Sequence, residues 1–414
     1  MSPRRAKALL LVASLALGLG ATELALQLAP GLLPGSYLAR FPGHGTEFFH
    51  PDVFERTPVE GVLLPHLAQA RVGPPPADLI ELGLAPRDAD DDRRAFPRVA
   101  IPADARGFVN LALPTRADLA LVGDSFGVAC GVREPTGLQA LLEERTGRAV
   151  FNASLSGIGP AQELWLLENE VLPRAPRVVL WFFFGGNDVT ADHEAWLARR
   201  AGHATWAEAW PERRRPRWLL PDLLAHSFAA SPPPPCPVPL APFELELVDG
   251  GARRQWFAPD HLAQLAWDEA TWRAYPAFEP VRATLAAARD ACRARGAQLL
   301  LVYLPSAPEV LLPLVRPAPE LFLRTLSATG APAPAEPAEA LFARALAQRH
   351  ALESVLRATT AEAGIPFLSA VPALTAAASE GQQVYLATDT HWTATGQRAL
   401  LEPLLAFLRA EGGL

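Results

Sequence analysis

The chain contains little cysteine. Its three cysteines, Cys130, Cys236 and Cys292, are too few for a disulfide framework and lack the spacing of zinc ligands. One bridge between Cys236 and Cys292 and a pair of unlinked buried thiols are both compatible with the sequence.

The chain also lacks any concentration of positive charge. Its 37 Lys and Arg residues stand against 44 Asp and Glu residues, for a formal net charge of −7, and no basic run is interleaved with aromatics. Nucleic acid is therefore excluded as an expected partner. Four histidines, His44, His50, His193 and His203, have no partners at metal-ligand spacing. We expect no metal site.

What is abundant is apolar sequence: half of the 414 residues are hydrophobic and a fifth are charged. This balance is typical of a globular protein with a large core. The length allows two or three units, and the pattern favours one main domain with insertions.

The amino-terminal segment has the layout of an export signal. Arg4, Arg5 and Lys7 precede an uncharged apolar run from Ala8 to Ala21. The run ends before Glu23 and is shorter than the ~20 residues that span a bilayer comfortably. Residues 1–32 are predicted to be a signal peptide or, since no small-x-small cleavage site stands out, a retained signal anchor. Both predict a location outside the cytoplasm, in a bacterial periplasm or anchored to the membrane by one helix.

Residues 33–106 are rich in Pro, Asp and Arg without a persistent period, which indicates a linker and a cap segment. From residue 107 to residue 414 apolar strands alternate with amphipathic helices. Strands are predicted at 117–122, 149–151, 178–184, 298–303 and 365–368, and helices at 138–147, 161–171, 281–295, 338–363 and 393–409. Fully apolar strands that alternate with helices predict a three-layer α/β/α sandwich around a central parallel sheet.

Two stretches interrupt this alternation. Residues 190–280 contain scattered tryptophans and a proline-dominated piece, which we interpret as an insertion beside the active edge of the sheet. The tryptophans favour core packing over the stacking of sugar rings. Residues 305–337 are rich in Pro and Ala and are predicted to form a loop.

Four polar loops lie next to strand ends or helix starts, where open parallel sheets bind their ligands. In chain order they are Gly123-Asp124-Ser125, the loop 152–160 with Gly157, Gly185-Gly186-Asn187-Asp188, and Asp389-Thr390-His391-Trp392. Each loop alone is also compatible with an ordinary turn.

Together the loops hold the parts of a serine nucleophile. Ser125 follows a strand in a turn, and Asp389 and His391 are spaced so that the carboxylate orients the imidazole. The side-chain amide of Asn187 and a backbone N–H at Gly157 are suited to donate hydrogen bonds to developing negative charge.

These loops, in this order, resemble blocks I, II, III and V of the SGNH (GDSL) hydrolase superfamily. The resemblance implies a flavodoxin-like sandwich, a triad of Ser125, His391 and Asp389, an oxyanion hole formed by Ser125, Gly157 and Asn187, and no metal or organic cofactor. One residue fewer separates acid and base than in the commoner form. The pattern Asp-x-His-Trp is similar to that of alginate and other exopolysaccharide O-acetyltransferases.

The expected activity is that of an exported ester hydrolase or O-acyltransferase with an acyl-serine intermediate. Its expected substrate is an acyl ester, such as an O-acetylated carbohydrate, and the sequence leaves the acyl acceptor, water or a sugar hydroxyl, open. The alternative is a non-catalytic carbohydrate-binding protein or export-complex subunit that retains the fold.

Overall fold

The computed structural model describes most of the main domain and part of the amino-terminal half. The described residues are 3–28, 55–56, 62–63, 71–73, 78–81, 83–86, 89, 99–101, 108, 110, 114–128, 137–155, 158–190, 218–228, 239–248, 250–328 and 336–414. The chain divides into two compact units: Met1–Phe54 with Pro211–Pro232, and Glu55–Trp210 with Pro233–Leu414.

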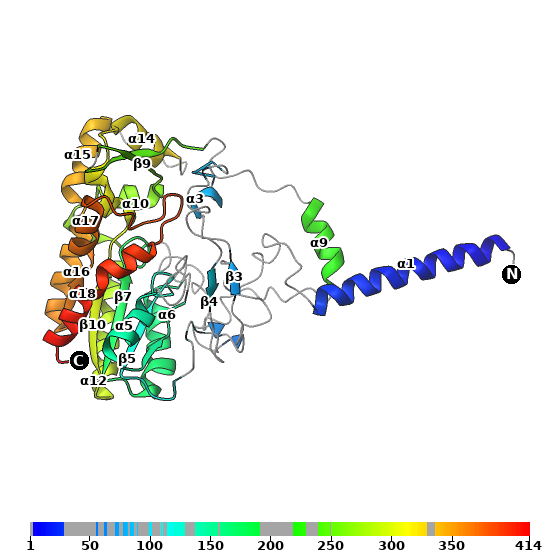
Figure 1. Ribbon diagram of the computed structural model, residues 1–414, viewed down its shortest axis with the longest axis horizontal. Helices are drawn as coiled ribbons and strands as arrows, with labels where there is room; N and C mark the ends of the chain where they lie inside the picture. Colours follow the sequence, from blue (N-terminus) through cyan, green and yellow to red (C-terminus); the bar gives the residue numbers. More distant parts are fainter. Residues whose placement is uncertain are drawn as a thin grey trace. The chain divides into compact units, whose positions relative to one another are not determined.

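The second unit is built on a five-stranded sheet with the order β11-β10-β7-β5-β6, in which all neighbours are parallel. Its strands are β5 (Leu119–Gly123), β6 (Val150–Asn152), β7 (Val178–Phe184), β10 (Gln298–Leu304) and β11 (Phe367–Ser369). This order is the flavodoxin-like one, with a reversal of strand order between β5 and β7. The predicted parallel sheet is confirmed, and β7 has the predicted bounds (Figure 1).

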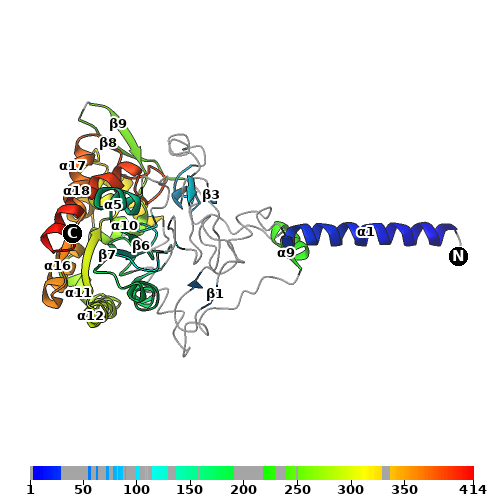
Figure 2. The ribbon, with the colours of Figure 1, turned by 60° about the horizontal axis from the view of Figure 1, so that its bottom comes forward.

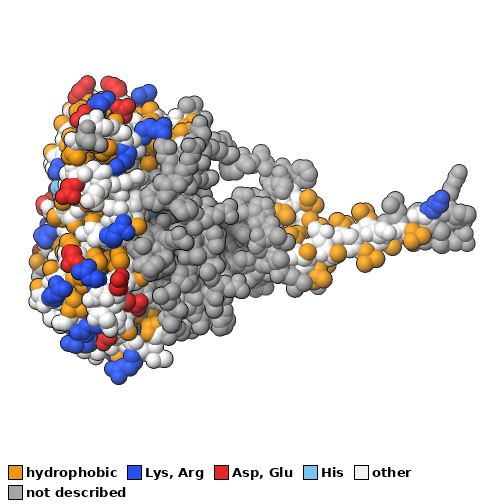
Figure 3. Space-filling model, in the orientation of Figure 1, with side chains coloured by type: hydrophobic (Ala, Val, Ile, Leu, Met, Phe, Trp, Pro, Cys, Tyr) orange, Lys and Arg blue, Asp and Glu red, His pale blue; other side chains and the backbone are white. Residues whose placement is uncertain are grey.

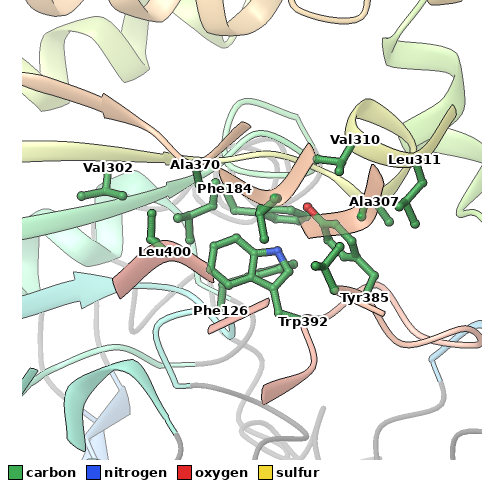
Figure 4. Close-up of a cluster of buried hydrophobic side chains, with 14 of the residues drawn as sticks. Phe126, Phe184, Val302, Ala307, Val310, Leu311, Ala370, Tyr385, Trp392 and Leu400 are labelled. Carbon is green, nitrogen blue, oxygen red and sulfur yellow. The ribbon is translucent and has the colours of Figure 1, made fainter. Parts of the chain in front are cut away.

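The strands are apolar throughout because both faces of the sheet are covered. Every residue of β5 and β7 is buried. Alternate side chains point to opposite faces, and on one face Leu180, Phe182 and Val302 join a large core cluster (Figure 4). The residues between them, such as Val179 and Trp181, are equally buried.

Helices pack on both sides of the sheet, as predicted for a three-layer sandwich (Figures 1 and 2). One row contains α6 (Pro160–Leu166), α12 (Phe278–Ala294) and α16 (Ala351–Ala363), which contact β5, β10 and β11 in turn. Another contains α5 (Leu138–Thr146), α18 (Ala394–Ala410) and α17 (Val371–Ser379), followed by α13 (Ala307–Leu311).

Three predicted elements differ in the structure, and one helix was not predicted. The predicted loop 305–337 contains α13, the short 3₁₀ helix η5 (Leu312–Leu314) and α14 (Pro319–Ser327), because its prolines occupy first helical turns, where no N–H is needed. The predicted helix 338–363 is two helices, α15 (Ala338–Gln348) and α16. The helix predicted to end at residue 171 finishes in a π turn, η3 (Leu167–Val171), and a 3₁₀ turn, η4 (Leu172–Arg174). Helix α17 was not predicted.

Residues 239–274, the later part of the predicted insertion, belong to the main core. They form the hairpin of β8 (Phe243–Glu246) and β9 (Ala252–Gln255), then α10 (Pro259–Gln264) and α11 (Glu269–Ala274). Phe243, Phe257 and Leu262 join the large core cluster. Trp256 and Trp272 are buried, which confirms core packing for these two tryptophans, whereas Trp218 is 60% exposed, so core packing is wrong for that residue.

In the second unit, five short elements precede β5. They are β1 (Glu55–Arg56), β2 (Val62–Leu63), β3 (Arg71–Gly73), α3 (Asp78–Glu81) and β4 (Val99–Ile101), with β1 paired to β2 and β3 to β4. The backbone N–H of Leu79 in α3 donates to the carbonyl of Thr388, so α3 lies against the loop that carries Asp389 and His391.

The first unit contains α1 (Pro3–Leu28) and α9 (Leu219–Phe228). Helix α1 exposes apolar side chains along its length, among them Leu10, Leu15 and Leu24 (Figure 3). The buried carboxylate of Glu23 accepts hydrogen bonds from the backbone N–H groups of Leu219 and Leu220, at 2.8 and 2.7 Å. Within the described residues, no helix combines the length and apolarity needed to cross a bilayer.

Cys292 is a buried free thiol on α12, and burial raises its pKa to about 12. Cys130 and Cys236 lie outside the described residues.

Candidate active site

Ser125 lies in the turn that follows β5, at the carboxyl end of the sheet. The strand ends at Gly123, where a Cβ atom would lie 2.8 Å from the backbone oxygen of Phe182 in the neighbouring strand β7. Only glycine permits this close approach of the two strands. The chain then turns, with the N–H of Val128 donating to the carbonyl of Asp124, and presents Ser125 as a partly exposed side chain.

The structure brings Ser125, His391 and Asp389 together from opposite ends of the domain. The hydroxyl oxygen of Ser125 is 2.7 Å from Nε2 of His391, and Nδ1 of His391 is 2.6 Å from Oδ1 of Asp389. The same carboxylate oxygen accepts the backbone N–H of His391 at 2.9 Å. Asp389 is fully buried and the His391 side chain is 15% exposed. The short Asp-x-His spacing thus still allows the carboxylate to hold the imidazole.

Aromatic rings fix the position of this imidazole. The ring of Phe126 lies 5.0 Å from that of His391 and 5.5 Å, edge to face, from that of Trp392. Trp392 is itself 2% exposed and part of the core cluster (Figure 4). The residue after the histidine is therefore a packing residue that anchors the loop.

Asp124 is a fully buried carboxylate beside the nucleophile. Its Oδ1 accepts the backbone N–H of Phe126 at 2.9 Å, which is the Asx-type turn compatible with this tripeptide. Burial raises the pKa of Asp124 to about 6, against the opposing effects of the Phe126 hydrogen bond and the nearby His391. Asp124 therefore changes charge close to neutral pH at the edge of the site.

Asn187 lies in a tight turn directly after β7. The turn is closed by the N–H of Asp188, which donates to the carbonyl of Phe184, and by a 2.7 Å bond from the N–H of Phe184 to the Asp188 carboxylate. The Oδ1 atom of Asn187 is buried and has no hydrogen-bond partner in the described part of the chain.

Gly157 lies outside the described residues, so its predicted oxyanion role stays a prediction. Its loop is held on both sides: the N–H of Leu155 donates to the carbonyl of Gly123, and the N–H of Gly159 to the Gln162 side chain. Before it, the Asn152 amide donates to the carbonyl of Gly127 at 2.8 Å and links this loop to the nucleophile turn.

Sequence reasoning missed the polar side chains that support these loops from residues 239–274. Gln255 donates to the carbonyls of Leu386 and Ala387, at 2.9 and 3.3 Å, just before the loop with Asp389. His261 and Gln264, on α10, contact the turn that carries Asn187. A single sequence does not show that a glutamine in a region without a clear hydrophobic period supports a distant loop.

One group of described residues has the donor set of a metal site: Glu309, His350 and Glu353, whose ligand atoms lie within 4.8 Å of one another. These groups already bond to the protein. The Tyr303 hydroxyl donates to Glu309 at 2.7 Å, and His350 Nδ1 lies 3.1 Å from the other Glu309 oxygen. The histidines considered in the sequence, His44, His50, His193 and His203, lie outside the described residues.

The sequence profile of the GDSL-like Lipase/Acylhydrolase family matches residues 121–399, from β5 into α18. The chain belongs to this family. The matched range begins just before Ser125 and includes Asn187, Asp389 and His391. The GDSL family membership and the parallel sandwich make the protein a serine esterase or hydrolase.

Several solved structures of lipases and esterases are similar to the chain at low sequence identity. An extracellular lipase from Streptomyces rimosus is 15% identical, with 70% of this chain and 99% of that chain covered and a TM-score of 0.37. A phospholipase A1 from Streptomyces albidoflavus is 14% identical over 70% and 99%, with a TM-score of 0.36. An acetyl xylan esterase is 13% identical over 70% and 98%, with a TM-score of 0.34. No curated protein matches the chain.

Proposed function

We propose that this GDSL-family protein cleaves acyl esters through an acyl-enzyme formed on Ser125, with His391 as general base and Asp389 as its orienting acid. The observation that carries the proposal is the continuous chain of short contacts from the Ser125 hydroxyl through both nitrogens of His391 to the buried Asp389 carboxylate. This is the arrangement by which a serine hydroxyl is activated.

The reaction proceeds by two acyl transfers. His391 Nε2 takes the hydroxyl proton as Ser125 Oγ attacks the ester carbonyl carbon, and the carbonyl oxygen becomes an oxyanion. As the intermediate collapses, the alcohol leaves with the proton from His391. Water or a second hydroxyl compound then attacks the acyl-serine while His391 takes its proton. As this intermediate collapses, His391 gives that proton to Ser125 Oγ, which leaves as the free hydroxyl. Asp389 stabilises the imidazolium in both steps.

In this proposal the oxyanion is held by the backbone N–H of Ser125, the backbone N–H of Gly157 and the amide of Asn187. The location of Asn187 in a tight turn after β7, at the same sheet edge as Ser125, supports its part. Donors that are fixed before the reaction lower the barrier because they need no reorganisation as charge develops.

The test is the hydrolysis of p-nitrophenyl acetate by the full chain and by Ser125→Ala and His391→Ala. Both variants should lose activity by a factor of ~10⁴ or more, because the triad residues act as a unit. Ser327→Ala, which removes a hydroxyl bonded within α14, is the matched control and should keep the wild-type rate. Unchanged activity in Ser125→Ala would remove the serine from the mechanism.

We further propose that the natural substrate is an O-acylated compound such as an O-acetylated carbohydrate. The sequence Asp389-Thr390-His391-Trp392, similar to that of exopolysaccharide O-acetyltransferases, supports this proposal. The acceptor is tested by incubating the enzyme with p-nitrophenyl acetate and an oligosaccharide. Acetylated sugar would identify a transferase, and acetate released at an unchanged rate would identify a hydrolase.

We propose that the protein acts outside the cytoplasm. The basic residues Arg4, Arg5 and Lys7 before the apolar run from Ala8 to Ala21 support export. Fractionation of producing cells, followed by sequencing of the mature amino terminus, tests the location and the fate of residues 1–32 together. Recovery of the whole protein from the cytosol would contradict the proposal.

A further inference from the structure

Helix α10 is hydrogen-bonded to the turn that carries Asn187. The Gln264 side-chain amide, 8% exposed, donates to the carbonyl of Gly186 at 3.0 Å and to the hydroxyl of Thr190 at 3.1 Å. The Gly186 carbonyl belongs to the same planar peptide unit as the N–H of Asn187. Gln264 therefore sets the orientation of the peptide from which Asn187 extends.

Thr190 closes this arrangement on the other side of Asn187. Its backbone N–H donates to the carbonyl of Asn187 at 2.9 Å, and its hydroxyl lies 3.4 Å from the carbonyl of Gly186. The two carbonyls that flank the Asn187 Cα atom are thus both held. Gln264 and the Thr190 hydroxyl hold the carbonyl of Gly186, and the Thr190 N–H holds the carbonyl of Asn187.

His261 occupies the space next to Gly186 that a side chain would fill. A Cβ atom at Gly186 would lie 2.7 Å from Nε2 of His261 and 2.5 Å from the ring of Phe184. The His261 ring is 5% exposed and meets the Phe184 ring edge to face at 5.6 Å, and Phe184 stacks at 4.0 Å on Phe126, the residue after the nucleophile. Burial lowers the pKa of His261, which keeps the ring neutral in this packing.

The side chain of Asn187 itself supplies little restraint. Its Oδ1 has no hydrogen-bond partner in the described part of the chain, so the direction of its amide follows from the backbone that carries it. A donor to an oxyanion must be placed within a few tenths of an ångström, and a misplacement of about 1 Å can cost ~100-fold in rate.

We propose that His261 and Gln264 are positioning residues that aim Asn187 at the oxyanion. The inference rests on the proposed function of Asn187. It extends that function to a helix of the insertion, which lies more than seventy residues along the chain from the turn it holds. The two side chains act through Asn187 and do not themselves contact the reacting atoms.

The test is a double-mutant cycle with Gln264→Met, which keeps the length of the side chain and removes the donor. In the wild-type background, kcat for p-nitrophenyl acetate should fall ~10- to 100-fold with KM changed less than about threefold. In the Asn187→Ala background the same substitution should change kcat less than about twofold, because residues in one network are not additive. An equal fall in both backgrounds would overturn the inference.

Two further variants keep the test independent of folding defects. Thr190→Val preserves shape and removes the hydroxyl, and His261→Ala removes the ring that packs on Gly186; both should show the same dependence on Asn187. In Gln264→Met and Thr190→Val the pH midpoint of kcat/KM should stay at the wild-type value, because neither change removes a titratable group near His391. Wild-type kcat in Gln264→Met and His261→Ala would also refute the inference, whereas inactivity of the wild type itself would refute the proposed function instead.

Discussion

Asn187 differs from the three triad residues in how it is held. Ser125, His391 and Asp389 are linked to one another by short contacts, whereas the Asn187 amide oxygen is buried without a hydrogen-bond partner among the described residues. An unsatisfied buried polar atom is costly to keep and is more common at functional sites than elsewhere. Because no bond to Oδ1 restrains the amide, the direction in which its Nδ2 group donates follows from the backbone that carries Asn187.

At this scale we expect Asn187→Ala to lower kcat by a factor of ~100 to 1000, which corresponds to ~3 kcal/mol of barrier. The expected loss reflects one missing donor to the oxyanion, so KM should change little. Steady-state kinetics with p-nitrophenyl acetate measure both constants. Asn169→Ala, which removes an exposed amide bonded to the carbonyl of Trp165, is the matched control. Wild-type kcat in Asn187→Ala would exclude the side chain from the oxyanion hole.

Among the secondary-structure elements, those with a clear apolar period were predictable from the sequence. Strand β7 and the helix cap at Thr393, whose hydroxyl accepts the N–H of Gly396, are where the sequence predicts them. The helices within residues 305–337 were not predicted. They are short and begin at prolines, so they show no apolar period in the sequence.

For the site, the sequence was informative where polar residues directly follow a strand or precede a helix, and uninformative where support comes from elsewhere in the chain. Ser125, Asp389 and His391 lie together as predicted. The contacts of Gln255 and Gln264 depend on how the insertion packs, which is a long-range property without a local signature.

Also at the scale of elements, Glu23 should determine how stably the first turn of α9 forms. Its carboxylate accepts the N–H groups of Leu219 and Leu220, which no residue within α9 can satisfy. We expect Glu23→Ala to weaken this turn by ~1 kcal/mol, or about fivefold in its opening equilibrium. Hydrogen exchange at Leu219 and Leu220 measures the change.

Glu23→Gln retains one acceptor oxygen and should give an intermediate rate. Exchange as slow in Glu23→Ala as in the wild type would show that the cap contributes nothing to α9.

For the molecule as a whole, Asp124 links stability to pH. Its pKa is raised from 3.8 to about 6 in the folded protein, so between these values the folded state binds more protons than the unfolded one. Stability from this group is fully present below pH 3.8 and is lost as the pH rises through about 6. The shift of roughly two pKa units sets an upper bound of about 3 kcal/mol.

Asp124→Asn removes the titration and keeps an oxygen to accept the N–H of Phe126. The free energy of unfolding of the wild type, relative to this variant, should therefore decrease from pH 4 to pH 7. Urea denaturation across this range measures the difference, with Asp290→Asn, a change at a 63% exposed carboxylate, as control. A difference that stays constant with pH would contradict the raised pKa.

The contacts of residues 239–274 also decide how the chain can be shortened or recombined. Gln255 holds the loop before Asp389 and Gln264 holds the turn around Asn187, so a single segment supports a turn that follows β7 and a loop that precedes α18. A minimised enzyme that replaces this segment with a short connector retains Ser125, His391 and Asp389 and loses the donors that hold the loop before Asp389 and the turn around Asn187. Any graft from another scaffold must bring one amide side chain to the carbonyls of Leu386 and Ala387 and another to the carbonyl of Gly186.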